Sequence, residues 1–426
     1  MNFVFSNRAK LFSIILMVIG AIAIVGGFFA DGTEHHGRWW SNLLINGFYF
    51  LGISLGALFF YALHFATETA WAVMLRRVME GVFSFIPYAA VALVVVFIGA
   101  SLHWNHIYHW MDQSVLSEFV SEASAESEHP EYFDTLEEAE ESGVVVVQNE
   151  DFDEIIANKS AYLNIPFFWV RTVIYFVVFI LFARWFRRRS LKEDQEGGTR
   201  LHKLGYKRGA LYLVLFAVFS STLAWDWLMS IDTHWFSTLF GWYVFSGMWV
   251  SAMNVITILT LYLISKGYLK DLNSSHVHDM GKWVFALSFL WSYLWFSQFM
   301  LIWYSNIPEE VTYFITRIEE YKVPFFGMFI INFALPMLIL MSRDAKRNPG
   351  FLIAIGTIIF IGHYVDTYML VAPGVLYENG EFGWMEIGFF IGFTGLFINR
   401  VLSTLTKASL VPKQSPYLDE SLHHSI

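Results

Sequence analysis

The sequence predicts an all-α polytopic membrane protein with about ten transmembrane helices. Hydrophobic residues make up 56% of the 426 residues and charged residues only 15%, whereas a soluble domain carries about 25% charged residues. The apolar residues form long continuous runs, and a transmembrane helix needs roughly 17–25 of them. Strands of a membrane β-barrel would alternate apolar and polar residues, and these runs do not alternate.

Ten runs are long and apolar enough to cross a membrane. In chain order they cover residues 11–29, 43–65, 82–102, 165–182, 210–227, 240–264, 283–303, 325–341, 351–370 and 382–398. The first run also resembles a signal peptide, because Arg8 and Lys10 precede it and small residues lie near its end. Its length and the charge pattern of the loops favour a helix that is retained.

The loop charges predict that both termini lie inside. With that orientation, 22 of the 27 lysine and arginine residues fall in inside segments, as the positive-inside rule requires. The insertion at 104–164 then lies outside; it holds 15 acidic residues and one lysine, and it accounts for the net charge of −10. It is either a solvated acidic loop with a short strand at 144–147, or a docking surface for a partner. The basic inside loop at 187–208 is expected to contact anionic membrane lipids.

An internal repeat predicts how the helices are grouped. The segment at 39–50 and the segment at 235–245 share the pattern aromatic-Ser, Leu, then Gly-aromatic-Tyr. Each opens a helix from the outer face. We therefore expect two four-helix units, spans 2–5 and spans 6–9, and two peripheral helices. The corresponding segments are helix 1 at 1–40, the first unit at 41–230, the second unit at 231–372, and helix 10 with the tail at 373–426.

Ionisable residues in or beside the spans fall into two groups. The outer group comprises His103, His106, Asp226, Asp232, His234, His363 and Asp366, and the inner group comprises His64, Glu68, Arg76, Arg77, Glu80 and Asp344. Charges inside a bilayer are costly and often mark proton or ion paths. The proton path that we predict uses His363, Asp366, His64, Glu68, Asp226, Asp232, His234, His103 and Glu80.

Three spacings make specific predictions about these residues. His363 and Asp366 are three apart and should meet on one helical face, with His363 about 22 Å into its helix at 1.5 Å per residue. His64 and Glu68 are four apart near the inner end of the second span. Asp226 and His234 would share a face if their helix continued.

Neutral polar residues lie between the two groups. They could relay protons with water, or hold helices together. They are Ser54, Ser246, Ser251, Asn254, Ser288, Ser292, Gln298 and Asn332. In the same region, Gly52 and Gly56 fit a close helix-packing face.

The absence of cysteine limits the redox chemistry of the chain. Thiolate-bound iron–sulfur clusters and covalently attached haem are excluded. Haem b is disfavoured because His363 has no facing histidine in the helix cores. No metal site and no nucleic-acid partner are expected.

Two segments carry a resemblance to a known family. The sequence DWLMSIDTHWFST at 226–238 resembles the Asp-Trp-x-Met-Ser-(Leu/Ile)-(Glu/Asp)-x-His-Trp-(Phe/Tyr)-Ser-Thr motif of the polysulfide-reductase-type, or NrfD-like, membrane subunits of alternative complex III. The sequence IWYSNIPEE at 302–310 resembles the end of helix 7 in that family. The chain is most similar to the smaller, F-type, of the two related ten-helix subunits.

The resemblance implies a respiratory role in the inner membrane of a bacterium, with the insertion at 104–164 in the periplasm. That complex oxidises quinol and passes electrons through iron–sulfur and multihaem cytochrome c subunits to cytochrome c or a terminal oxidase. The F-type subunit is proposed to help move protons, and the larger relative is thought to hold the main quinol site. The chain is thus expected to be a cofactor-free subunit with a proton path.

Three other functions remain open at this point. The chain could bind quinol itself, with His103, Asp226 and His363 as candidate quinone contacts. It could be a stand-alone secondary transporter, as repeats and polar groups near the midplane suggest. It could also be a scaffold in which the polar residues only join helices.

Overall fold

The computed structural model describes residues 3–124, 127 and 130–425. Glu126 and Glu128 of the predicted acidic insertion, and the first two residues of the predicted N-terminal segment, lie outside the described residues. Within the described part, ten helices are long and apolar enough to cross a membrane. The predicted fold class, an all-α polytopic membrane protein, is therefore confirmed.

Seven of the ten spans are single helices or begin with a short 3-10 turn. They are α1 (Asn7–Ala30), η1 (Glu34–His36) with α2 (Gly37–Ala66), α8 (Ile165–Glu196), α10 (Phe240–Ser265), α11 (Ser274–Ser305), α16 (Pro349–Leu376) and α17 (Trp384–Leu405). A further span joins α9 (Arg200–Trp227) to the 3-10 turn η4 (Met229–Ile231). Several helices extend beyond the apolar runs into segments that carry charged residues, as α8 does from residue 183 to Glu196.

Two spans are interrupted. The third consists of η2 (Trp71–Leu75), α3 (Arg76–Phe83) and α4 (Ile86–Ser101). Its inner half lies before the predicted start at residue 82, because buried charges lower its hydropathy. The eighth consists of α13 (Lys322–Phe329), the π-helical turn η5 (Ile330–Ala334) and α14 (Leu335–Ile339).

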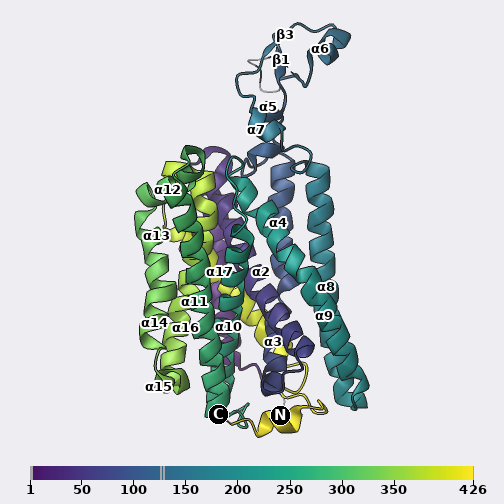
Figure 1. The fold of residues 1–426 in the computed structure, drawn as a ribbon, viewed down its shortest axis with the longest axis vertical. Helices are drawn as coiled ribbons and strands as arrows, with labels where there is room; N and C mark the ends of the chain where they lie inside the picture. The colour runs from purple at the N-terminus through teal and green to yellow at the C-terminus, as the bar shows by residue number, and fades with distance from the viewer. Residues whose placement is uncertain (1–2, 125–126, 128–129, 426) are drawn as a thin grey trace.

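Short elements cover the two ends of the bundle. On the side of the insertion, α12 (Pro308–Glu319) is an amphipathic helix after the seventh span, and η6 (Tyr377–Asn379) follows α16. On the side of the termini lie α15 (Arg343–Arg347) and α18 (Leu418–Leu422). Both termini are at the same end of the bundle, and the insertion projects from the opposite end (Figure 1).

The insertion contains a small antiparallel sheet with strand order β2-β1-β3. Its elements are η3 (His109–Met111), α5 (Gln113–Leu116), β1 (Phe119–Ser121), β2 (Tyr132–Phe133), α6 (Leu136–Ser142), β3 (Val146–Gln148) and α7 (Glu154–Ala157). In the register, Phe119 faces Phe133 on one side and Gln148 on the other. The strand predicted at 144–147 overlaps β3.

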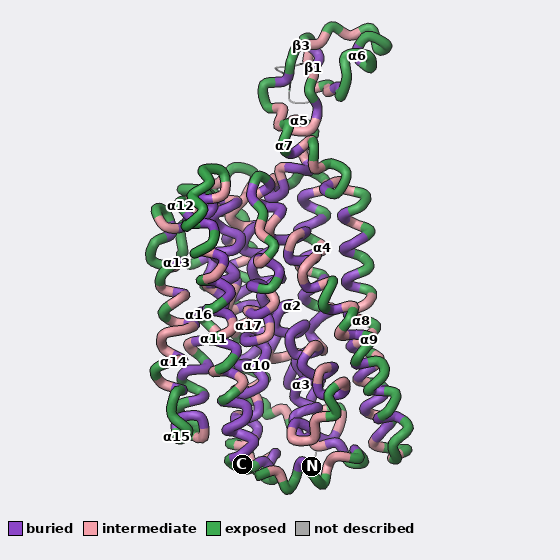
Figure 2. Tube along the Cα trace, in the orientation of Figure 1, coloured by how far each residue is buried: buried purple, intermediate pink, exposed green. Residues whose placement is uncertain are grey.

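Helix α2 is the centre of the bundle. It packs against α4, α9, α10, α16 and α17, and buried residues follow α2, α3 and α10 through the middle of the molecule (Figure 2). The predicted packing face at Gly52 and Gly56 is confirmed, because both glycines lie against Met248 of α10. A Cβ on Gly56 would come within 2.5 Å of the Met248 carbonyl oxygen, so only glycine permits this approach of the two helices.

Helices α1 and α17 form a second close pair. A Cβ on Gly392 of α17 would lie 2.5 Å from the Cα of Gly20 of α1. Helix α17 joins this pair to the rest of the bundle through contacts with α2 and α3. The pair therefore packs as a unit on the side of the central helix.

Candidate functional site

A buried carboxylate on α16 is the centre of the candidate site. Asp366 accepts a hydrogen bond from the Trp291 ring N–H of α11 (2.9 Å) and another from the Tyr243 hydroxyl of α10. His363 lies one turn before it, with Nδ1 3.3 Å from the carboxylate. His363 and Asp366 are therefore in contact, as their spacing predicted. Three helices converge on one acidic group.

The depth of Asp366 explains why it needs these donors. It lies ten residues before the end of α16 at Leu376, which is about 15 Å at 1.5 Å per residue. Only 4% of Asp366 is exposed. An ionised carboxylate at such a position is costly unless hydrogen bonds stabilise it. Tyr243 and Trp291 supply two such bonds.

A small cavity lies beside the His363–Asp366 pair. Its volume is about 20 Å³, and Gly247, Ser251 and Gly52 also line it. That volume suffices for about one water molecule. The other ring nitrogen of His363, Nε2, is buried and has no hydrogen-bond partner among the described residues. A water molecule in this cavity could therefore bridge polar groups around the pair.

Arg317 of α12 lies on the side of this centre nearer the insertion, which we call the outer side (Figure 1). Its guanidinium donates to Asp232 Oδ2 (3.2 Å) and to the backbone oxygens of Met369 (3.2 Å) and Tyr313 (2.8 Å). It also lies 3.3 Å from the centroid of the Tyr313 ring. The side chain is 3% exposed. Arg317 thus holds α12 against α16 and pairs with a predicted site residue.

A second small cavity lies against both Arg317 and Tyr243. It has a volume of about 20 Å³ and is lined by Tyr243, Gln298, Tyr313 and Arg317, among apolar residues. The Gln298 Oε1 atom is buried and lacks a partner among the described residues. Tyr243 therefore contacts Asp366 on one side and lines a space that reaches Arg317 on the other.

A larger cavity opens at the outer end of the same path. It has a volume of about 450 Å³, and its polar lining includes Asp232, Arg317, Tyr313, His109 and His234. Polar groups thus continue from this outer cavity through Arg317, Tyr313 and Tyr243 to Asp366. We call this series the outer path.

Two groups at the mouth of the outer path have shifted pKa values. Burial lowers the pKa of His109 below its ordinary value of 6.5, although Asp112 opposes the shift. Burial also raises the pKa of Tyr313 well above 10. At neutral pH both side chains are therefore uncharged, and Tyr313 can donate its hydroxyl proton to a hydrogen bond.

Asp226 lies in a separate ion pair. Its carboxylate accepts hydrogen bonds from Arg171 Nε (2.8 Å) and Nη2 (3.0 Å) and from the Tyr175 hydroxyl (2.9 Å). Asp226 and His234 do not share a helical face, because α9 ends at Trp227 and the helix does not continue to His234. His234 instead contacts Asp153 of the insertion (2.5 Å).

His103 and His106 meet the insertion at its first acidic residue. Their Nδ1 atoms lie 3.0 and 2.9 Å from the two carboxylate oxygens of Asp112. The His109 ring lies 4.0 Å from the same carboxylate. These histidines therefore surround Asp112 at the outer surface, and among them only His109 also lines the outer cavity.

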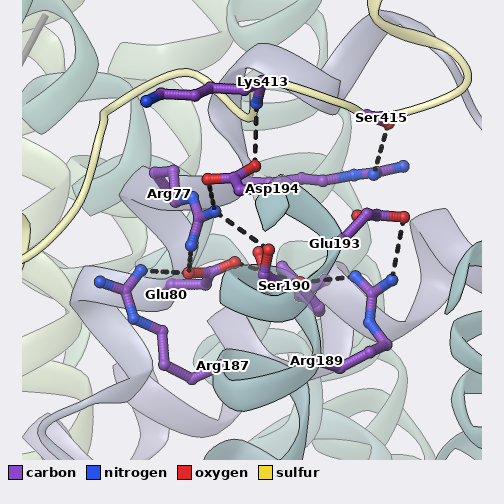
Figure 3. Close-up of polar contacts among 11 residues, drawn as sticks. Arg77, Glu80, Arg187, Arg189, Ser190, Glu193, Asp194, Lys413 and Ser415 are labelled. Carbon is purple, nitrogen blue, oxygen red and sulfur yellow. Dashed lines mark hydrogen bonds and ion pairs between the residues drawn. The ribbon is translucent and has the colours of Figure 1, made fainter. Parts of the chain in front are cut away.

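The inner charged residues form a network between α3, α8 and the C-terminal tail (Figure 3). Arg77 donates to Glu80 (3.0 Å) and to Asp194 (2.6 Å), and Arg187 also contacts Glu80. Arg76 donates to Ser415 of the tail (3.0 Å). Glu80 is fully buried but paired with two arginines, so its position favours a stable ionised carboxylate.

The four-residue spacing of His64 and Glu68 does not place them on one helical face. Helix α2 ends at Ala66 and Glu68 has φ +51°, so Glu68 leaves the helical face. His64 Nδ1 lies 2.7 Å from the Phe60 carbonyl oxygen, while Glu68 lies 3.7 Å from His202 of α9. Asp344, the remaining member of the inner group, is exposed in the first turn of α15.

The neutral polar residues differ in their contacts. Ser54, Ser246 and Ser292 donate to backbone oxygens of their own helices. Asn254 instead joins α10 to α16 through the Gly356 carbonyl oxygen (2.6 Å). Both amide atoms of Asn332 and the hydroxyl of Ser288 are buried without a partner among the described residues. Asn332 lies in the π-helical turn η5.

A scan against protein-family models finds no match for the chain, and a search of curated proteins also finds none. Within the described residues, no group of three or more His, Cys, Asp or Glu side chains is arranged to hold a metal ion.

Five residues of the site and its outer path were not predicted from the sequence: His109, Tyr243, Trp291, Tyr313 and Arg317. Tyr243 belongs to the repeated Gly-aromatic-Tyr pattern, and this repetition could have marked it as a candidate site residue. Arg317 is one of only five lysine and arginine residues that lie outside the segments predicted to be inside. A basic residue on the disfavoured side of a membrane protein is a reasonable candidate for a specific ion pair.

Proposed function

We propose that this chain is a cofactor-free integral membrane subunit of a quinol-oxidising complex of the alternative complex III type, and that it contributes a transmembrane proton path. The observation that carries the proton path is the outer path itself. A buried carboxylate with a histidine beside it is linked by polar groups and cavities to an open cavity at one face. The motif at 226–238 supports the choice of complex.

The chemistry of the path follows from its hydrogen bonds. When Asp366 is ionised, it accepts from both Tyr243 and Trp291. When it takes up a proton from His363 or from water in the adjoining cavity, its carboxyl group can donate to the Tyr243 oxygen instead. The Tyr243 hydroxyl is then free to turn toward the cavity that it shares with Arg317. Asp366 thus exchanges protons with the outer side through Tyr243.

Arg317 places a fixed positive charge in the outer path. That charge opposes an excess proton close to it and so raises the barrier to proton passage. Asp232, which accepts from Arg317, lies at the cavity mouth and can receive protons that leave. Toward the inner side, Ser251 and Asn254 lie about two and three turns beyond Tyr243 on α10, in the direction of the inner network. Electrons would pass only through iron–sulfur and haem groups of partner subunits.

The orientation and setting belong to the same proposal. The positive-inside charge distribution supports cytoplasmic termini and a periplasmic insertion. With that orientation the outer path opens to the periplasm of a bacterial inner membrane. The partners would be the related ten-helix subunit and the iron–sulfur and multihaem cytochrome c subunits, with a terminal oxidase downstream.

A quinol site in this chain is the second candidate, because the outer cavity of about 450 Å³ lies in the range of ligand pockets, about 300–1,000 Å³. The sequence-predicted contacts do not converge there. His103 contacts Asp112, Asp226 pairs with Arg171, and His363 contacts Asp366. Recovery of quinone crosslinked to His109 or His234 would favour this function.

The proton path is tested by Asp366→Asn and Tyr243→Phe in the assembled complex. Asparagine keeps the shape of the side chain but cannot hold the transferred proton, and phenylalanine removes the hydroxyl that joins Asp366 to the outer path. Proton release per electron is measured in reconstituted vesicles. We expect electron transfer to continue and the proton yield to fall.

The matched control is Tyr212→Phe on α9, since the buried Tyr212 hydroxyl has no partner among the described residues. It should leave the proton yield unchanged. If both Asp366→Asn and Tyr243→Phe released protons at the wild-type yield while electron transfer was full, the proposed path would be contradicted.

A further inference from the structure

An apolar groove lies between the α1–α17 pair and the helices α10 and α16. Its volume is about 360 Å³. The lining is almost entirely carbon and includes Phe12, Val255, Tyr262, Thr357, Phe397 and Leu402. Exposure of such an apolar surface to water is unfavourable, whereas a bound hydrocarbon chain would remove the surface from water.

The groove belongs to the half of the bundle that carries the termini. Phe12 lies near the start of α1, and Tyr262 and Leu402 lie near the ends of α10 and α17. From Val255 to Tyr262 the groove follows α10 for about 10 Å at 1.5 Å per residue. This length accommodates a substantial part of one acyl chain that runs parallel to the helices.

Three cationic residues lie next to groove-lining residues at the end of the groove nearest the termini. Arg8 and Lys10 flank the groove-lining Ala9. The Lys266 ammonium lies 5.7 Å from the centroid of the Tyr262 ring, which also lines the groove. Basic groups between transmembrane helices at the cytoplasmic surface are typical of sites for anionic lipid headgroups. We call Arg8, Lys10 and Lys266 the cationic rim.

We propose that the groove and its cationic rim bind one anionic phospholipid, with an acyl chain in the groove and the phosphate at the rim. The rim decides between this occupant and others. A quinone tail would fill the apolar part, but its uncharged head would leave the cations unused. A zwitterionic lipid would offer the same phosphate together with a positive group that the rim repels. This lipid would join the α1–α17 pair to α10 and α16.

Native mass spectrometry of the purified protein, in whatever assembly it is isolated, tests the proposal. Phosphatidylglycerol and phosphatidylethanolamine are titrated separately as probes. We expect the wild-type protein to retain one phosphatidylglycerol and to bind phosphatidylethanolamine more weakly. Lys266→Gln should weaken phosphatidylglycerol binding about fivefold, which is the effect of one cation near a lipid surface. The same variant should leave phosphatidylethanolamine binding unchanged.

A second variant tests the groove itself. Thr357 is exposed and lines it, so Thr357→Trp should fill the groove without disturbing the core and should abolish retention of both lipids. Matched controls are Val214→Trp on the exposed face of α9, where Val214 is 67% exposed, and Lys192→Gln at the inner end of α8. Both should bind as the wild type does.

Three results would overturn the proposal: equal binding of the two lipids by the wild type, wild-type retention by Thr357→Trp, or recovery of quinone in place of phospholipid. If Thr357→Trp did not fold, the headgroup preference and the Lys266→Gln titration would still decide.

Discussion

Loss of the Arg171 guanidinium should destabilise the bundle strongly, because it would leave Asp226 buried without its cation. Asp226 is 0% exposed and accepts two hydrogen bonds from Arg171 and one from Tyr175. Arg171→Met keeps an apolar stem between Tyr162 and Phe167, the two rings that the guanidinium contacts, but removes both charged donors. Breaking a buried ion pair in this way costs about 3–5 kcal/mol.

The assay is equilibrium unfolding in mixed micelles, followed by tryptophan fluorescence. Lys192→Met is the matched control, because Lys192 and Glu196 form an exposed pair at 3.1 Å, and such pairs contribute about 0–1 kcal/mol. The double variant Arg171→Met with Asp226→Leu should recover most of the loss, since no unpaired charge remains. Stability of Arg171→Met within about 1 kcal/mol of the wild type would refute this reasoning.

Two further changes test the histidines around Asp112 and the packing of α1 against α17. Because burial lowers the pKa of His109 below 6.5, the unfolded chain binds its proton more readily, and stability should fall as the pH drops below 6.5. In a plot of the unfolding midpoint against pH, His109→Gln should reduce the slope below pH 6.5. An unchanged slope would contradict this prediction. Gly392→Val should lower the free energy of unfolding by about 1–3 kcal/mol, because its side chain would overpack against Gly20. The control Gly327→Ala has nothing within 4 Å of its new Cβ, so its free energy of unfolding should stay within about 0.5 kcal/mol of the wild type. Equal stabilities of the two variants would contradict the close α1–α17 contact.

Hydropathy was sufficient to predict the ten spans, because desolvation of long apolar runs does not depend on their neighbours. It was insufficient where charges are buried. The inner half of the third span was missed since Arg76, Arg77 and Glu80 lower its hydropathy. Ion pairs with α8 compensate the charges of Arg77 and Glu80, whereas Arg76 donates to Ser415 of the tail. Helix α12 was missed because its mixed composition resembles a loop, yet Pro308 at its start and acidic residues in its first turn are ordinary helix signals.

The candidate site shows the same limit. The contact between His363 and Asp366 could be predicted because helical geometry fixes neighbours three residues apart. The partners of Asp232 and His234 could not, since Arg317 and Asp153 are brought to them by tertiary packing. The spacing of His64 and Glu68 was misleading because the helix ended between them.

Purification of the chain from its native membrane tests the central claim most directly. A subunit of a quinol-oxidising complex should be isolated together with haem-bearing and iron–sulfur partners, with cytochrome c absorption in the same fraction and quinol oxidation that depends on the assembly. Isolation of the chain alone and colourless, under conditions mild enough to retain bound lipid, would contradict this account and favour a stand-alone transporter.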